Sequence, residues 1–330
     1  MLTTHIDFAI YKDAKKKWRA YFKSNPKLFK GVNSFLDFIE SYTNIRLYNV
    51  KEDIETLNLI NELFQGIGDN VKKPKKISVS LASRIDKHII KSPYQFFFVE
   101  SDYPLSDKYK NAIVGTTNDY VEIFSKCNQN SQIRLGTENA KNRFVSWEDV
   151  LPDIPVTEII INDNYLFKKT DDSIPEQNAF KLLETIGEKY KQLKRVLIIS
   201  YFDFESIASL NCIKSEGGKY NYIECSERLR KIIEDCFLEN TEVILIGNQE
   251  EHDRHIFSNY FYLETPSLNN IFDLNGNLIY KKSGSLSLHS YLSPNNFENA
   301  SDILKNFKIN ISKYNKNNRN YHSALLDGID

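Results

Sequence analysis

The second half of the sequence alternates short apolar runs with segments of helical periodicity. The three apolar runs have strand length and are TEIIIND at 157–163, KRVLIIS at 194–200 and TEVILIGN at 241–248. Segments with apolar residues at helical spacing separate them, at 176–193 and 226–238. Unbroken apolar runs are typical of strands covered on both faces, and their alternation with helices predicts crossovers within a largely parallel sheet. We therefore expect an α/β fold.

The length of 330 residues exceeds what one hydrophobic core usually holds, so we expect two domains. A connector is predicted at 151–155, where Pro152 and Pro155 lack backbone donors. The predicted domains are a mixed α/β domain at 1–152 and an α/β domain at 153–330, which ends in a polar, Asn-rich tail. The apolar SALL segment of this tail is expected to dock.

The first domain is predicted to contain helices followed by strands. Helices are expected at 12–30, 31–44 and 51–70. Strands are expected at 75–83, 94–101 and 118–126. This half contains no Gly-rich phosphate loop, no nucleophile elbow and no paired metal motif. Its sequence therefore indicates no particular chemistry.

A basic, aromatic segment, KDAKKKWRAYFKSNPKLFK, occupies residues 12–30. On a helix, Trp18, Tyr21 and Phe22 lie toward one side and the basic side chains toward the other. Two interpretations remain open. The aromatic side chains dock into a core while the lysines are solvated, which is common on exposed helix faces, or the segment contacts nucleic acid or an anionic membrane.

Charge and cysteine content exclude some classes of site. The net charge is −1, so polyanion binding would need a local basic patch. The cysteines form no CxxC pair and have no histidine at metal-ligand spacing, so we expect reduced thiols, no metal and no cofactor. They are Cys127, Cys212, Cys225 and Cys236. No apolar leader is visible and no apolar run approaches the roughly 20 residues that cross a bilayer, so we expect a soluble, cytoplasmic protein.

The segment HDRHIFSNYFYLETPSLN follows the third apolar run, at 252–269. Its alternation predicts one strand over 252–264, on which His252 and Arg254 face the same side. An imidazole beside a guanidinium suits a phosphate ester, because histidine acts as a nucleophile or proton carrier near neutral pH and arginine offers a rigid positive fork. This segment is therefore the candidate functional site.

Polar residues follow each of the three apolar runs, namely Asp163, Asp203 and Asn248. Ligand sites in α/β sheets usually lie beyond the carboxyl ends of the strands. Asp203 is a candidate supporting residue at this edge, where it would bond the backbone or pair with Arg254.

The spacing within 252–269 resembles the signature of the phospholipase D superfamily: His, any residue, Lys, four residues, Asp, six residues, Gly, Ser, any residue, Asn. The corresponding residues here, with no insertion, are His252, Arg254, Asn259, Pro266, Ser267 and Asn269. The His-Asp-Arg form is similar to the divergent phospholipase D-like domain attached to microtubule-interacting-and-trafficking modules. It is also similar to that of uncharacterised bacterial proteins, some from phage-defence loci. The resemblance covers residues 155–290.

The resemblance implies a phospholipase D-like α/β sandwich domain and a phosphodiesterase, more specifically a nuclease that needs neither metal nor cofactor. In the family, the motif histidine attacks phosphorus to form a phosphohistidine, and the histidine of a second motif protonates the leaving group. Since this chain contains one such motif, the resemblance implies a homodimer that brings two copies of His252 together. His252 and Arg254 are then the catalytic candidates. The candidates for binding or supporting phosphate are Asn259, Ser267, Asn269 and Asp203.

Three departures from the signature leave a second interpretation open. Arg254 keeps a positive charge but replaces a compact ammonium with a planar fork. Asn259 removes a negative charge, and Pro266 removes an N–H that glycine would offer. The alternative is a catalytically inactive module that binds a phosphate group, or an assembly subunit with partner proteins in a bacterial, anti-phage system.

Purely structural roles are also open for the site residues. A buried ring bonded to a backbone carbonyl is the alternative for His252, although the matching Ser and Asn favour a phosphate site, and a tie at a strand edge is the alternative for Asn259. Ser267 and Asn269 lie in a turn-rich stretch, PSLNN, where these residue types are common.

Overall fold

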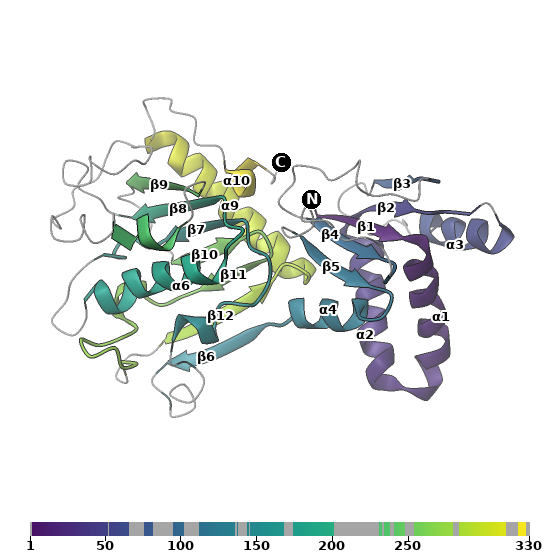
Figure 1. Cartoon of the computed structure of the whole chain (residues 1–330), viewed down its shortest axis with the longest axis horizontal. Helices are drawn as coiled ribbons and strands as arrows, with labels where there is room; N and C mark the ends of the chain where they lie inside the picture. Colours follow the sequence, from purple (N-terminus) through teal and green to yellow (C-terminus); the bar gives the residue numbers. More distant parts are fainter. Residues whose placement is uncertain are drawn as a thin grey trace. The chain divides into compact units, whose positions relative to one another are not determined.

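The computed structural model describes residues 2–51, 53–65, 76–81, 95–101, 112–135, 137, 144, 146–167, 174–200, 231–232, 234–237, 241–247, 254–279, 284–314 and 323–327. These residues form helices and two β-sheets, which confirms the predicted α/β class (Figure 1). No helix in these ranges is both long enough and apolar enough to cross a membrane.

The chain divides into two compact units. Unit 1 holds Met1–Asn128 with the short segment Leu292–Pro294, and unit 2 holds Gln129–Tyr291 and Asn295–Ile329. The division falls after Asn128, upstream of the boundary expected between residues 152 and 153. The physical reason is that strand β6 pairs within the sheet of unit 2 and the segment around Trp147 packs into its core.

Unit 1 contains a five-stranded sheet in which every neighbouring pair is parallel. Its strands are β1 (Thr3–Asp7), β2 (Asn44–Tyr48), β3 (Ile77–Val79), β4 (Gln95–Val99) and β5 (Ile113–Thr116), in the order β3-β2-β1-β4-β5. The predicted strands at 75–83 and 94–101 correspond to β3 and β4. β1, β2 and β5 were not predicted from sequence, because they are short and carry polar residues.

The helices of unit 1 are α1 (Phe8–Ser24), α2 (Pro26–Asp37), the π-helical turn η1 (Phe38–Tyr42), α3 (Ile54–Gln65) and α4 (Tyr120–Cys127). The basic segment at 12–30 is split between two helices, because Pro26 begins α2 and Asn25 caps it by accepting a hydrogen bond from Leu28 N at 3.2 Å. Proline at the first helical position and asparagine before it are favoured at a helix start.

The predicted strand at 118–126 is wrong, since these residues form most of α4. Asp119 Oδ1 accepts hydrogen bonds from Thr116 N at 2.6 Å and Thr116 Oγ1 at 2.8 Å, which closes a turn directly before the helix. Tyr120 and Phe124 are one helical turn apart, and both are buried against α2. The helical spacing of these two rings outweighs the β propensity of the segment.

Unit 2 contains a mixed seven-stranded sheet. Its strands are β6 (Ser131–Leu135), β7 (Glu158–Asn162), β8 (Arg195–Ser200), β9 (Glu242–Gly247), β10 (His255–Ser258), β11 (Phe261–Glu264) and β12 (Gly284–Ser290), in the order β6-β12-β11-β10-β7-β8-β9. The three apolar runs form the parallel strands β7, β8 and β9, as predicted. The other neighbouring pairs are antiparallel.

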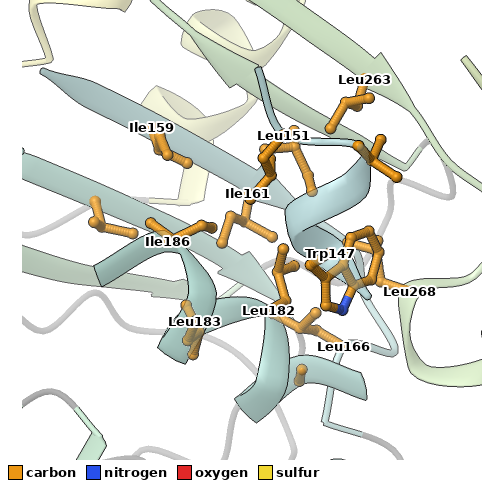
Figure 2. Packing of buried hydrophobic residues seen from close by; sticks show 14 of the residues in the cluster. Trp147, Leu151, Ile159, Ile161, Leu166, Leu182, Leu183, Ile186, Leu263 and Leu268 are labelled. Carbon is orange, nitrogen blue, oxygen red and sulfur yellow. The ribbon is translucent and has the colours of Figure 1, made fainter. Parts of the chain in front are cut away.

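The two faces of this sheet are covered by different helices (Figure 1). A π-helical turn, η5 (Glu176–Phe180), leads into α6 (Lys181–Lys189), which packs on one face. Figure 2 shows Leu182 and Ile186 of α6 facing Ile159 and Ile161 of β7. On the other face, the α9 helix (Pro294–Tyr314) places Phe307 edge-on to Phe257 of β10, with ring centroids 5.7 Å apart.

The single strand predicted over 252–264 is wrong, because the described part of this segment forms a hairpin of β10 and β11. Ser258 Oγ accepts hydrogen bonds from Tyr260 N and Phe261 N and donates one to Phe261 O. This serine therefore closes a tight turn. The hairpin reverses the chain, so the residues that follow β11 return to the end of the sheet where β10 begins.

The predicted docking of the SALL segment is confirmed. Leu325 and Leu326 of α10 (Ala324–Asp327) are buried, and Leu325 N donates a hydrogen bond to Glu158 Oε2 at 3.2 Å. Glu158 is the first residue of β7, so the segment docks at the amino end of β7, and Asp163 lies at the other end of this strand.

Candidate functional site

Three polar side chains meet in one row at the carboxyl ends of β7 and β8. Extending the pairing of β10 with β7 by one residue places Arg254 opposite Asp163. Extending the pairing of β7 with β8 places Asp163 beside Ser200. By strand alternation this row belongs to the α6 face of the sheet, the face to which Ile161 and Ile256 contribute core residues.

Asp163 is the centre of this row. Its side chain is 0% exposed, and its two oxygens accept backbone hydrogen bonds from different segments. Oδ1 accepts from Tyr165 N at 2.8 Å, and Oδ2 accepts from Leu268 N at 2.6 Å. Burial raises the pKa of Asp163, while the hydrogen bonds from Tyr165 and Leu268 and the charge of Arg254 oppose that rise.

Arg254 lies directly before β10 and its side chain is 29% exposed. Its Nε atom is 3.7 Å from Asp163 Oδ1, which is longer than a hydrogen bond, and its Cζ atom is 5.9 Å from the centre of the Tyr165 ring. The guanidinium has five N–H donors. Among the residues that the structure describes, its Nε makes no hydrogen bond, so Arg254 offers donors to an anion there.

The segment after β11 returns to Arg254. Thr265 N donates a hydrogen bond to Arg254 O at 3.1 Å, which fixes the base of the hairpin. Ser267 Oγ donates to Asn269 Oδ1 at the start of the short 3₁₀ turn η6 (Leu268–Asn270). Because Leu268 N donates a hydrogen bond to Asp163, the Ser267–Asn269 pair is held at the same end of the sheet as Arg254.

The apolar core holds this polar segment from beneath. Leu268 is fully buried in the α6-side core, together with Trp147 and Leu166 (Figure 2). Asn178 of η5 is 0% exposed and holds the next residues, because its Oδ1 accepts from Ile271 N at 2.9 Å and Phe272 N at 2.8 Å. Its Nδ2 donates to the carbonyl oxygens of Phe272 and of residue 174 on the η5 side. The Ser267–Asn269 pair is thus built on a rigid support.

Asn259 lies away from these residues. It is 0% exposed in the turn between β10 and β11, and its Oδ1 accepts a hydrogen bond from Thr157 N at 3.1 Å. Thr157 precedes β7, so this contact lies at the amino end of β7, whereas Arg254 lies at its carboxyl end. Asn259 ties a strand edge, which is the structural role left open above.

His252 and Asp203 lie outside the described residues, as does Asn248. Among the predicted site residues that the structure describes, Arg254 and the Ser267–Asn269 pair lie at the same end of the sheet through Asp163, and Asn259 lies at the other end. His252 is two residues from Arg254 in the chain.

Two residues of the site were not among the candidates from sequence. Asp163 was noted only as the polar end of an apolar run, and its role as a double acceptor depends on a contact with a residue 105 positions away. Ser200 ends the next apolar run and is fully buried, and its Oγ has no hydrogen-bond partner within the described ranges. In both cases the usable signal was a polar residue that ends an apolar strand.

Neither the models of known protein families nor the curated proteins match this chain. The arrangement offers the partly exposed guanidinium of Arg254, the buried hydroxyl of Ser200, which has no partner among the described residues, and the Ser267–Asn269 pair, all at one end of the sheet. These groups are hydrogen-bond donors suited to the oxygens of an anion.

Proposed function

We propose that unit 2 is a phospholipase D-like phosphodiesterase that acts as a metal-independent nuclease. The single observation that carries the proposal is that the hairpin of β10 and β11 returns the Ser267–Asn269 pair to the edge where Arg254 lies. The hairpin thereby gives a structural reason for the spacing between the residues that resemble the phospholipase D signature. The two halves of the motif, HxR and SxN, are brought to one phosphate only when the residues between them form a hairpin.

The proposed roles follow from the chemistry of each group. Arg254 binds two phosphate oxygens through its fork, and the Ser267–Asn269 pair supplies further polar contacts. An imidazole nitrogen of His252 attacks phosphorus and the bond from phosphorus to the leaving oxygen breaks. That oxygen takes a proton from a second histidine. Water then attacks the phosphohistidine and gives a proton to the second histidine, which releases the second product and restores both histidines.

The second histidine is proposed to be His252 of another copy of the chain. One chain carries a single HxR…SxN motif, and a twofold axis places the same residue of both copies at one site. The proposal therefore includes a homodimer, and its oligomeric state is measured by sedimentation. A strict monomer that cleaves at full rate would remove this part of the proposal.

The test is cleavage of single-stranded DNA, single-stranded RNA and a generic aryl phosphodiester, each with EDTA in excess. His252→Ala should lower the rate about 10²- to 10⁴-fold, and Arg254→Ala about 10²-fold or more. The matched controls are His289→Ala, a partly exposed histidine of β12, and Arg195→Gln, an arginine at the opposite end of β8 that is paired with Glu242. Full cleavage by His252→Ala would overturn the catalytic assignment.

A second candidate is a non-catalytic module that binds a phosphate group or serves as a subunit of a bacterial defence assembly. The observation that favours it is the Arg254–Asp163 contact, which places a carboxylate beside the guanidinium and reduces the net positive charge at the site. Under this alternative, no diester is cleaved, but a phosphorylated ligand binds and Arg254→Ala abolishes that binding. Absence of both cleavage and binding would reject both candidates.

A further inference from the structure

A basic surface lies on the helical pair α1 and α2 of unit 1. The two helices run antiparallel and extend beyond the strands of the five-stranded sheet (Figure 1). Their basic side chains are Lys12, Lys15, Lys16, Lys17, Arg19, Lys23, Lys27 and Lys30, against the acidic Asp13 and Asp37. This local excess of positive charge contrasts with the net charge of −1 for the whole chain.

The basic side chains fall into two groups. The first group is neutralised within unit 1 by the ion pairs Lys12–Glu55, Lys15–Glu40, Lys17–Asp13 and Arg19–Glu62. The second group has no ion pair within the described part of the chain and consists of Lys16, Lys23, Lys27 and Lys30. Lys23 and Lys27 flank the turn between the helices, so uncompensated charge gathers toward the tip of the pair.

Aromatic rings lie among these lysines. Phe22 is 59% exposed, and its ring centroid is 5.3 Å from that of Phe29 in an edge-on arrangement and 6.0 Å from that of Trp18. Trp18 Nε1 donates a hydrogen bond to Asn33 Oδ1 at 2.9 Å, which fixes the orientation of the indole. Leu28 at the tip is 46% exposed. The three rings therefore form a fixed aromatic cluster with Phe22 as its exposed member.

We infer that the tip of α1 and α2 binds single-stranded nucleic acid. A single strand has unstacked bases that stack on aromatic rings and phosphates that pair with lysines, and both elements are present here. The inference does not depend on the chemistry proposed for unit 2, because it concerns binding by unit 1. Binding by unit 1 would identify single-stranded nucleic acid as the substrate class of the nuclease proposed for unit 2.

A nucleic acid strand fits the tip of α1 and α2 better than a membrane surface does. Interfacial helices bury a continuous apolar face that runs along the helix. At this tip the large exposed apolar side chains are Phe22 and Leu28, and lysines surround them. A small aromatic contact within a basic surface suits base stacking and phosphate pairing.

The experiment measures fluorescence anisotropy of labelled oligothymidine and oligouridine of about 12 nucleotides, with the full chain carrying Arg254→Ala so that the proposed cleavage does not consume the probe. Phe22→Ala should raise the Kd about 5- to 100-fold, because one base loses its stacking partner. Phe22→Tyr keeps the ring and should restore binding. Phe64→Ala is the matched control, since Phe64 of α3 is 47% exposed but has none of these lysines on its helix.

The salt dependence tests the lysines separately. Lys23→Gln with Lys27→Gln should reduce the slope of log Kd against log salt by about 1.4, since each phosphate contact of a single strand contributes roughly 0.7. Lys181→Gln, at an exposed lysine of α6 in unit 2, should leave the slope unchanged. Circular dichroism of each variant establishes that it is folded.

Failure of this inference can be separated from failure of the proposed function. Arg254→Ala should prevent cleavage and leave binding at the α1–α2 tip intact. Binding that is insensitive to Phe22 and to the two lysines would overturn the inference, as would undetectable binding by the folded chain. Binding to anionic phosphatidylserine vesicles in place of the oligonucleotides would also overturn it.

Discussion

Replacing Asp163 with alanine tests whether one buried carboxylate holds the candidate site together. The substitution removes the acceptor of two backbone N–H groups, at 2.8 and 2.6 Å, that belong to segments far apart in the chain. A buried N–H left without a partner costs about 1–3 kcal/mol. The contact with Arg254 adds little, about 0–1 kcal/mol, because the guanidinium is partly exposed and the separation is 3.7 Å.

An opposing effect reduces the expected loss. Burial raises the pKa of Asp163, which means that the ionised carboxylate is destabilised by desolvation, and alanine removes that cost. We therefore expect a net loss of about 2–4 kcal/mol in the free energy of unfolding of unit 2. For a unit of this size, that loss corresponds to a fall in Tm of about 5–15 °C.

Tryptophan fluorescence during urea denaturation can report unit 2 alone. The chain has two tryptophans, of which Trp147 is buried in the core beside Leu268 and Trp18 lies in unit 1. In a Trp18→Phe background, the emission of Trp147 follows the unfolding of the α6-side core. A separate transition for unit 1 then does not distort the fit.

Asp273→Ala is the matched control. Asp273 also accepts two backbone hydrogen bonds, from Asn275 N at 2.8 Å and Asn277 N at 2.9 Å, but in an exposed turn where water replaces the lost acceptor. If Asp163→Ala costs no more than Asp273→Ala, burial does not make Asp163 the centre of the site and the reasoning is wrong.

Other contacts in unit 2 give further measurable effects. Asn178→Ala removes four hydrogen bonds and should cost about 2–5 kcal/mol in urea denaturation; an unchanged midpoint would contradict the role given to this side chain. Gly187→Ala should cost about 1–3 kcal/mol, because the new Cβ would lie 2.6 Å from the Cys236 carbonyl oxygen. Gly31→Ala, where the Cβ meets only a side-chain atom at 3.1 Å, should cost less. Since the native pKa of Asp163 is raised, the part of its contribution that is linked to protonation is fully present below the ordinary value of 3.8 and is lost as the pH rises through the native value, whereas its two backbone hydrogen bonds do not require the proton. Relative to Asp163→Asn, the native chain should therefore become less stable as the pH rises over that range, and a constant or growing advantage would contradict this direction.

The sequence by itself determined the α/β class and the strands that build the site edge. The runs at 157–163, 194–200 and 241–248 are apolar without alternation, and this pattern is a local property that only strands covered on both faces satisfy well. The polar residues that end these runs were also visible, as was the spacing of Arg254 from Ser267 and Asn269. Hairpin formation was not visible, because alternation continues through Ser258 as it does along a single strand.

Only the tertiary structure decided which of these residues meet. Asp163 accepts from Leu268 because β10 lies beside β7 in one register, and no local pattern specifies that pairing. The same register places Asn259 at the opposite end of β7, although its spacing within the motif is as regular as that of Ser267. Spacing along the chain fixes which residues are available, whereas strand order, strand direction and burial fix which side chains share one edge.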